Sequence, residues 1–255
     1  MSIDLRKQAE DNLIDLKKKA TISLTKRGLN GQVARVAAVF DISGSMTNLY
    51  RSGIIQKTAE RALALAMNFD DNGAADVFAF GLSNHEIGEI YQANFYQFVE
   101  REITSKHKLE MGTQYAGVMK QIADFYYPGA LKLSRKGGFL GLGSRTEYEI
   151  DASKFKNDPP VYVLFFTDGD NSDKEETREL IRGLSRLGIF FQFVGIGNER
   201  FYFLDELDNL DGRYIDNANF LKVKNLEKIS DDDLYDSLLI EFPTWLKEAK
   251  AKQLF

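Results

Sequence analysis

The chain contains no cysteine and only two histidines, His85 and His107, among its 255 residues. The absence of thiols excludes disulfide bonds, a cysteine nucleophile, iron–sulfur clusters and cysteine-ligated zinc. Neither histidine has a second histidine at the spacing that metal-ligand pairs usually show. We therefore expect both histidines to be loop or surface residues rather than metal ligands.

Prolines are also few, and long apolar runs are absent. The chain has 4 prolines and 44% hydrophobic residues, a composition typical of a folded chain rather than a disordered one. No segment is long and apolar enough to cross a bilayer, and residues 1–6 lack the apolar core of a secretory signal. The sequence thus predicts a protein that has no transmembrane segment and is cytoplasmic.

The chain has fewer positive than negative side chains: 33 lysines and arginines and 38 aspartates and glutamates give a net charge of −5. Binding to nucleic acid requires a basic face, so a nucleic-acid partner is not expected. A chain of 255 residues is long enough to bury a substantial core as one α/β domain or two small ones.

Short apolar runs alternate with segments of helical periodicity along most of the chain. This alternation predicts a doubly wound α/β fold, with a mainly parallel six-stranded sheet covered by helices on both faces. The expected strands cover residues 33–40, 75–80, 87–91, 161–167, 189–196 and 213–215, with a further short edge strand at 21–24. The expected helices cover residues 3–19, 54–69, 94–103, 113–127, 175–187 and 201–207, and one or two more lie within 231–250.

Two segments look like additions to this α/β domain. Residues 1–30 form an N-terminal helix and edge segment, and residues 31–255 form the domain itself. Within the domain, residues 131–158 are basic and rich in glycine, which predicts a mobile loop insertion with Phe139, Leu140 and Leu142 at its tip. This loop is either a solvated insertion or a flap that touches a partner or a membrane.

Polar clusters follow two of the apolar strands. Asp41, Ser43 and Ser45 come after the first, Asp168 follows the strand at 161–167, and residues 111–114 form a third polar loop before a helix. Ligands bind at the carboxyl ends of parallel strands, so these groups are expected to converge there. Oxygen ligands alone select a hard cation, and a Mg²⁺ ion that prefers about six oxygens would keep a position open for a partner's carboxylate.

This pattern resembles the metal-ion-dependent adhesion site (MIDAS) of von Willebrand factor A (vWA) domains. The matching residues are Asp41-Ile42-Ser43-Gly44-Ser45, a separate Thr113, and Asp168 within Thr-Asp-Gly. The resemblance implies that Ser43, Ser45 and Thr113 contact Mg²⁺ through their hydroxyls, with Mn²⁺ or Ca²⁺ as substitutes. It also implies that Asp41 and Asp168 act directly or through water.

Further segments resemble the tellurium-resistance branch of these domains, of the TerF type. Among them are residues 22–29, 66–73, 76–81, 167–171, 192–197 and 241–246, so the similarity extends over nearly the whole chain from about residue 20. The resemblance implies a role in a bacterial tellurium-resistance or stress-response system.

Simpler interpretations exist for each motif. Asp41 and Ser43 could cap a helix that begins near residue 47, and Thr113 could cap its own helix. Residues 168–179 partly match a calcium-binding EF-hand loop, but Asp173 stands where glycine is required and a strand precedes the loop. We therefore reject the EF-hand and expect Asp170 and Asp173 to be solvated or to adjust the field near the metal.

Three functions compete. The first is a non-enzymatic interaction module that binds an acidic group of a partner protein through Mg²⁺. The second is a metal-assisted phosphohydrolase, although Ser43 stands where the haloacid-dehalogenase pattern requires a second acid and no phosphate-binding loop is found. The third, direct chemistry on a toxic anion, is disfavoured because the chain has no thiols. We expect the interaction module.

Overall fold

The computed structural model describes residues 2–136 and 145–255. Its central feature is a six-stranded sheet, in which only β3 runs antiparallel to its neighbour. The strands follow the spatial order β3 (Asn84–Ile90), β2 (Ala75–Phe80), β1 (Arg35–Asp41), β6 (Val161–Thr167), β7 (Ile189–Ile196) and β8 (Ala218–Val223). The predicted fold class, a mainly parallel six-stranded α/β sheet, is confirmed.

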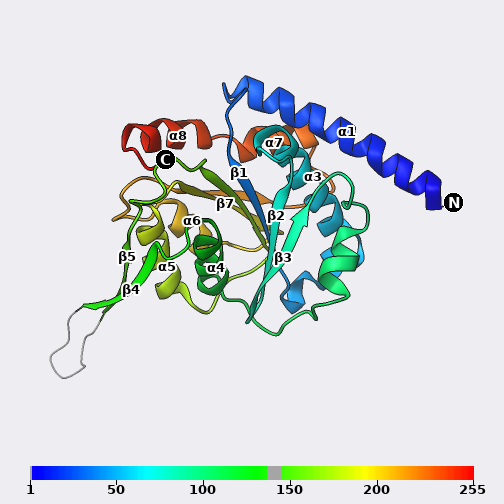
Figure 1. Ribbon diagram of the computed structural model, residues 1–255. Helices are drawn as coiled ribbons and strands as arrows, with labels where there is room; N and C mark the ends of the chain where they lie inside the picture. The colour runs from blue at the N-terminus through cyan, green and yellow to red at the C-terminus, as the bar shows by residue number, and fades with distance from the viewer. Residues whose placement is uncertain (1, 137–144) are drawn as a thin grey trace.

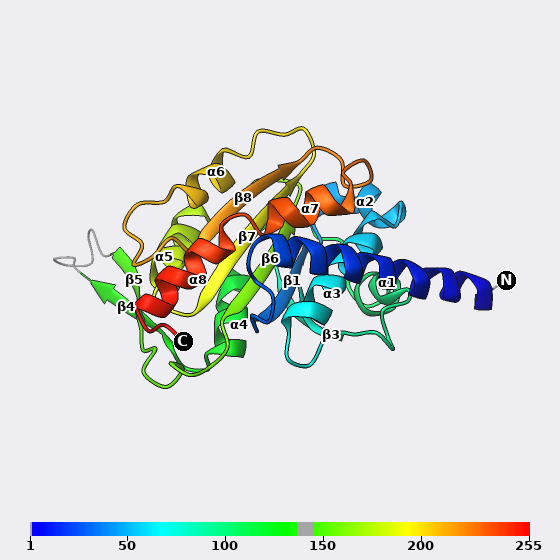
Figure 2. The same cartoon turned by 90° about the horizontal axis from the view of Figure 1, so that it is seen from above.

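Helices cover both faces of the sheet (Figures 1 and 2). The side chains of β1 alternate between two buried clusters, with Val36, Ala38 and Phe40 in one and Ala37 and Val39 in the other. The first cluster is completed by α3 (Ile54–Phe69), α7 (Asp231–Leu238) and α8 (Phe242–Ala251), and the second by α4 (Ala116–Tyr126), α5 (Lys174–Leu184) and α6 (Tyr202–Asp208). Coverage on both faces explains why β1, β6 and β7 are mostly apolar, without the alternation of apolar and polar residues that a half-exposed strand shows.

The N-terminal helix α1 (Ser2–Lys26) is longer than expected and packs against α3 and α7. Its buried side chains, Leu13, Leu16, Ala20 and Leu24, recur at helical spacing on one side. The predicted edge strand at residues 21–24 is therefore wrong, because these residues continue the helix. Figures 1 and 2 show the N-terminal end of α1 extending beyond the rest of the fold.

The predicted loop at residues 131–158 is also wrong in part. Strands β4 (Leu131–Lys136) and β5 (Arg145–Ile150) pair in an antiparallel two-stranded sheet beside α5. The sequence pattern did not reveal these two polar strands, because the many glycines between them indicated a loop. The three apolar residues predicted at the tip lie outside the described residues.

Smaller differences affect two other elements. The predicted strand at residues 213–215 is wrong, because Arg213 instead donates hydrogen bonds to the carbonyl oxygens of Leu207, Asp208 and Leu210 in and after α6. The last strand of the sheet is β8, which begins at Ala218. The predicted helix at 94–103 is a π-helical segment, η2 (Val99–Thr104). After β1, a 3₁₀ turn, η1 (Gly44–Met46), leads into the short helix α2 (Thr47–Arg51). Among the described residues, no helix is long and apolar enough to span a membrane.

We predict that α1 contributes to the stability of the whole domain. Leu16 is 3% exposed in the core shared with α3, whereas Ile14 on the same helix is 48% exposed. Leu16→Ala should lower the free energy of unfolding by about 2–4 kcal/mol, the range for a buried leucine. Ile14→Ala should change it by less than about 0.5 kcal/mol, as for other surface changes. Urea denaturation measures both, and equal small effects would show that α1 is a separate, loosely attached element.

Candidate metal centre

The candidate site lies where β1 and β6 end side by side. The two strands pair in parallel with Phe40 opposite Phe166, so the residues that follow them emerge at the same edge of the sheet. The rings of Phe40 and Phe166, one residue before these ends, stack with their centroids 5.5 Å apart. Asp41 is thereby held at the end of a fully buried strand, with none of its surface exposed.

A continuous chain of hydrogen bonds connects four of the five predicted site residues. The carboxylate of Asp41 accepts hydrogen bonds from the Ser43 backbone N–H and from the Thr167 hydroxyl, both at 2.6 Å. The hydroxyl oxygens of Ser43 and Ser45 lie 3.0 Å apart, and Ser45 donates to Asp168 Oδ1 at 2.6 Å. The structure therefore brings oxygen atoms that could bind a metal ion from two loops to one place.

Thr113 is positioned in a different way. Its backbone carbonyl accepts a hydrogen bond of 3.0 Å from the Ser172 N–H, which joins its loop to the loop after β6. In the described part of the chain, no hydrogen bond connects the Thr113 hydroxyl to the other four residues. Thr113 thus borders the site through its backbone, and its role as a ligand stays a prediction.

The loop that carries Thr113 is fixed against the first polar loop by Glu110. The Glu110 N–H donates to the Ile42 carbonyl and the Gly44 N–H donates to the Glu110 carbonyl, each at 2.8 Å. The Glu110 carboxylate accepts from the Ser83 N–H at 2.8 Å. A Cβ atom on Gly81 would lie 2.7 Å from this carboxylate, so only glycine fits there. No local sequence pattern indicates this role of Glu110, because its partners lie in two distant segments.

The capping interpretations do not describe the geometry found. Ser43 precedes η1 but its hydroxyl makes no capping hydrogen bond, and Thr113 does not cap α4. Instead Asp173, from the loop after β6, accepts from the Tyr115 and Ala116 N–H groups at 3.0 and 2.8 Å. The expectation that Asp173 is merely solvated or adjusts the field is therefore corrected: its carboxylate fixes the start of α4.

The two histidines, expected as loop or surface residues, lie close together. His85 lies in β3, and its ring centroid is 4.3 Å from that of His107. Residues 22 positions apart have no recognisable spacing, which is why the sequence did not pair them. Across residues 2–136 and 145–255, no group of three or more histidine, aspartate and glutamate side chains is arranged to hold a metal ion. The candidate site has only two carboxylates, so its remaining donors are hydroxyls.

Burial dominates the electrostatics of both carboxylates. It raises the pKa of Asp41 from 3.8 to about 6, an effect that the hydrogen bonds from Thr167 and Ser43 partly oppose and the nearby charge of Asp168 increases. Burial also raises the pKa of Asp168 above its usual range. Two partly desolvated carboxylates beside hydroxyl oxygens suit a hard divalent cation, whose charge would offset their desolvation. The residues present therefore fit the ion that the sequence predicts.

Comparison with known proteins decides the family. A model of the vWA domain found at the C terminus of TerF matches residues 33–134 and 147–255. The chain belongs to the TerF-like vWA family.

Other proteins agree with this assignment. YcbR, an uncharacterized protein of Bacillus subtilis strain 168, is 39% identical over 242 residues, which are 94% of this chain and 88% of YcbR.

The vWA fold of this chain is also similar to solved structures of proximal thread matrix protein 1 from the mussel byssus. One has 15% identity and a TM-score of 0.53 and covers 82% of this chain. Another, with a zinc-occupied MIDAS motif, has 14% identity, a TM-score of 0.51 and 85% coverage. This vWA chain spans about half the length of those structures, 47% and 46% respectively.

The raised pKa of Asp41 predicts how the stability of the metal-free vWA domain depends on pH. Because the folded state holds this proton more tightly than the unfolded chain, ionising Asp41 costs stability as the pH rises from about 4 to 6. The full cost is about 3 kcal/mol, from roughly 1.4 kcal/mol for each pKa unit. Asp41→Asn lacks this cost, so the stability of the variant relative to wild type should increase over that range and level off above it.

Urea denaturation in the presence of EDTA at several pH values measures this difference. Buried acids other than Asp168, whose charge acts on Asp41, titrate equally in both proteins and cancel in the comparison. A stability difference that does not change with pH would show that Asp41 is not desolvated as described.

Proposed function

We propose that this vWA domain is a non-enzymatic interaction module that binds an acidic group of a partner protein through Mg²⁺. Asp41, Ser43, Ser45, Thr113 and Asp168 would hold the ion, and Mn²⁺ or Ca²⁺ would substitute for it. The hydrogen-bonded chain from Asp41 to Asp168 is the observation that supports this proposal most strongly. The zinc-occupied MIDAS motif of the mussel protein is a precedent on the same fold.

The surroundings of the site favour binding over catalysis. Asp41 is fully buried and its two carboxylate oxygens already accept hydrogen bonds, so it is poorly placed to attack a phosphate. We therefore propose that the domain is not a phosphohydrolase. Exposed apolar side chains instead border the site: Met111, next to Gly44, is 93% exposed, and Leu82, next to Gly112, is 53% exposed. Apolar groups around a polar centre are typical of protein-binding surfaces.

A cavity of about 250 Å³ adjoins the site on its other side. Asp168 forms one wall, and Leu49, Ile54 and Leu226 are among the apolar residues that line it together with Lys224. An apolar side chain next to the partner's acidic residue would fit this cavity, while Lys224 would favour the acid itself. The family name and the resemblance to TerF-type domains support a role in a bacterial tellurium-resistance or stress-response system. We further propose that the protein acts in the cytoplasm.

Metal binding is testable by calorimetric titration of the metal-stripped protein with MgCl₂. Wild type should bind one Mg²⁺, and Asp41→Ala and Asp168→Ala should each abolish the signal because each removes a carboxylate that would hold the ion directly or through water. The matched control is Asp170→Asn, since Asp170 lies two residues from Asp168 but pairs with Lys174. Retained binding in both alanine variants would refute the assigned ligands, as would its loss in the Asp170 variant.

Partner binding is testable separately through Met111. Proteins that the immobilised domain captures from a bacterial extract in Mg²⁺ but not in EDTA should be lost with Asp41→Ala. Met111→Lys should weaken their capture roughly tenfold or more, as expected for a central apolar contact, while Mg²⁺ binding stays unchanged. Capture that is equal in Mg²⁺ and EDTA would contradict a metal-dependent module. Mg²⁺-dependent hydrolysis of p-nitrophenyl phosphate that Asp41→Ala abolishes would indicate an enzyme instead.

A further inference from the structure

A second cavity lies at the opposite edge of the sheet from Asp41. Its lining includes Phe190, the second residue of β7, and Asp216, which shortly precedes β8, so it is located at the amino ends of these strands. The segment before α8 and the helix itself form the other wall. The cavity measures about 290 Å³, near the lower limit for small-molecule sites, and is large enough for one side chain.

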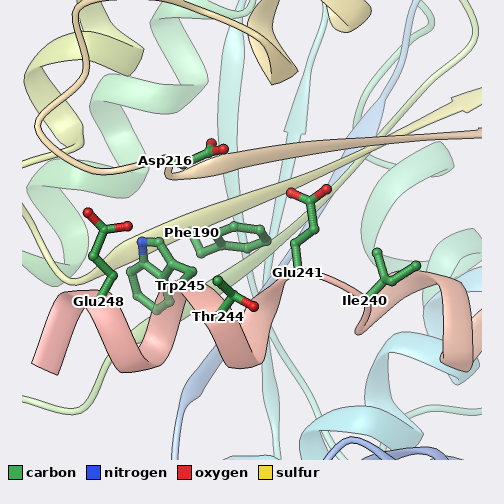
Figure 3. A pocket seen from close by; sticks show the side chains of 7 residues that line it. All are labelled: Phe190, Asp216, Ile240, Glu241, Thr244, Trp245 and Glu248. Atoms are coloured by element: carbon green, nitrogen blue, oxygen red, sulfur yellow. The ribbon is translucent and has the colours of Figure 1, made fainter.

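Three carboxylates surround an aromatic floor in this cavity, which we call the acidic pocket. Figure 3 shows Asp216, Glu241 and Glu248 spaced around the rings of Phe190 and Trp245. The two rings are buried, with 1% and 2% of their surface exposed, and their centroids lie 5.4 Å apart. Negative charge above aromatic faces is the environment that binds an organic cation.

The negative charge of the acidic pocket exceeds the positive charge near it. Asp216 pairs with Arg213 at 2.6 Å and Glu248 pairs with Lys252 at 3.1 Å. Glu241 has no ion pair within the described residues. Burial raises the pKa of nearby Asp208 to about 6, the charges of Glu241 and Asp216 add to this shift, and the charge of Arg213 opposes it. Of the three carboxylates of the acidic pocket, Glu241 therefore has no ion-pair partner of its own in the described chain, although the charge of Arg213 acts on it.

Trp245 provides an independent indication of a ligand. Its indole Nε1–H is buried and, within the described chain, has no hydrogen-bond partner. Figure 3 shows the ring nitrogen on the side of the indole that faces Asp216 and Glu248, away from the axis of α8. A buried donor without a partner costs stability, which an acceptor on a ligand would recover. A simple metal ion or amine cannot supply that acceptor.

We propose that the acidic pocket binds a lysine or arginine side chain of a partner polypeptide. The ammonium or guanidinium group lies among Asp216, Glu241 and Glu248, over the aromatic rings. A backbone carbonyl of the same residue accepts the hydrogen bond of the Trp245 indole. Ile240, 53% exposed at the rim, offers an apolar contact for the adjoining part of the partner. This site is separate from the candidate metal centre, which lies at the other edge of the sheet.

The single tryptophan of the chain makes this proposal directly testable. The full chain is labelled with ¹⁵N, and its one indole N–H resonance is followed during titration with N-acetyl-lysine methylamide. The resonance should shift downfield and saturate, because the indole gains a hydrogen bond. N-acetyl-norleucine methylamide, which lacks the charge, should give no saturable shift. n-Butylamine, which lacks the carbonyl, should bind more weakly and without the downfield shift.

Variants locate the binding within the acidic pocket. Glu241→Gln should weaken binding of the lysine probe roughly tenfold, as expected for loss of one charge-assisted contact. Glu86→Gln, an equal change at an exposed position on β3 at the far edge of the sheet, should leave it unchanged. An unmoved indole resonance, an equal response to the norleucine probe, or equal affinity in Glu241→Gln would each overturn the proposal. An equal downfield shift with n-butylamine would overturn the assigned role of the backbone carbonyl.

Discussion

The desolvation of Asp41 is the constraint on which the rest of the candidate metal centre depends. Its carboxylate is buried at the end of β1 and is satisfied by Thr167 from the adjacent parallel strand and by the backbone of Ser43. Those two contacts fix the direction in which the chain leaves β1, and they place Ser43 and Ser45 beside Asp168. A charge held in this way is costly unless a cation compensates it, so the fold itself favours metal binding here.

The surrounding loops keep this arrangement in place through backbone contacts. Glu110 ties the loop before α4 to the loop after β1, and Asp173 ties the start of α4 to the loop after β6. Three polar loops that are far apart in the sequence thus form one rigid edge. A preorganised edge would lower the entropic cost of the proposed binding of an ion and a partner's carboxylate. The acidic pocket, at the other end of β7, leaves this edge undisturbed.

The apolar strands and the metal motif could be predicted from the sequence, and other features could not, for physical reasons. Strands such as 161–167 are buried on both faces, so their composition alone reveals them. The motif of Asp41, Ser43 and Ser45 lies at the end of another such strand, β1, and is recognisable for that reason. Residues 21–24 have β-branched character, yet Leu24 continues the buried stripe of α1, and tertiary packing prevailed over local propensity. Contacts between distant segments, such as those of Glu110 and the pair His85 and His107, leave no local pattern.

Metal binding at this edge of the sheet is tested most simply by a crystal structure of the protein grown or soaked in Mn²⁺, with anomalous scattering used to locate the ion. We expect one strong anomalous peak bounded by the oxygens of Ser43, Ser45 and Asp168, with Asp41 behind them. The peak should disappear in Asp168→Ala and persist in Asp170→Asn. No peak at this edge of the sheet, or a peak only at Asp216, Glu241 and Glu248, would contradict this expectation.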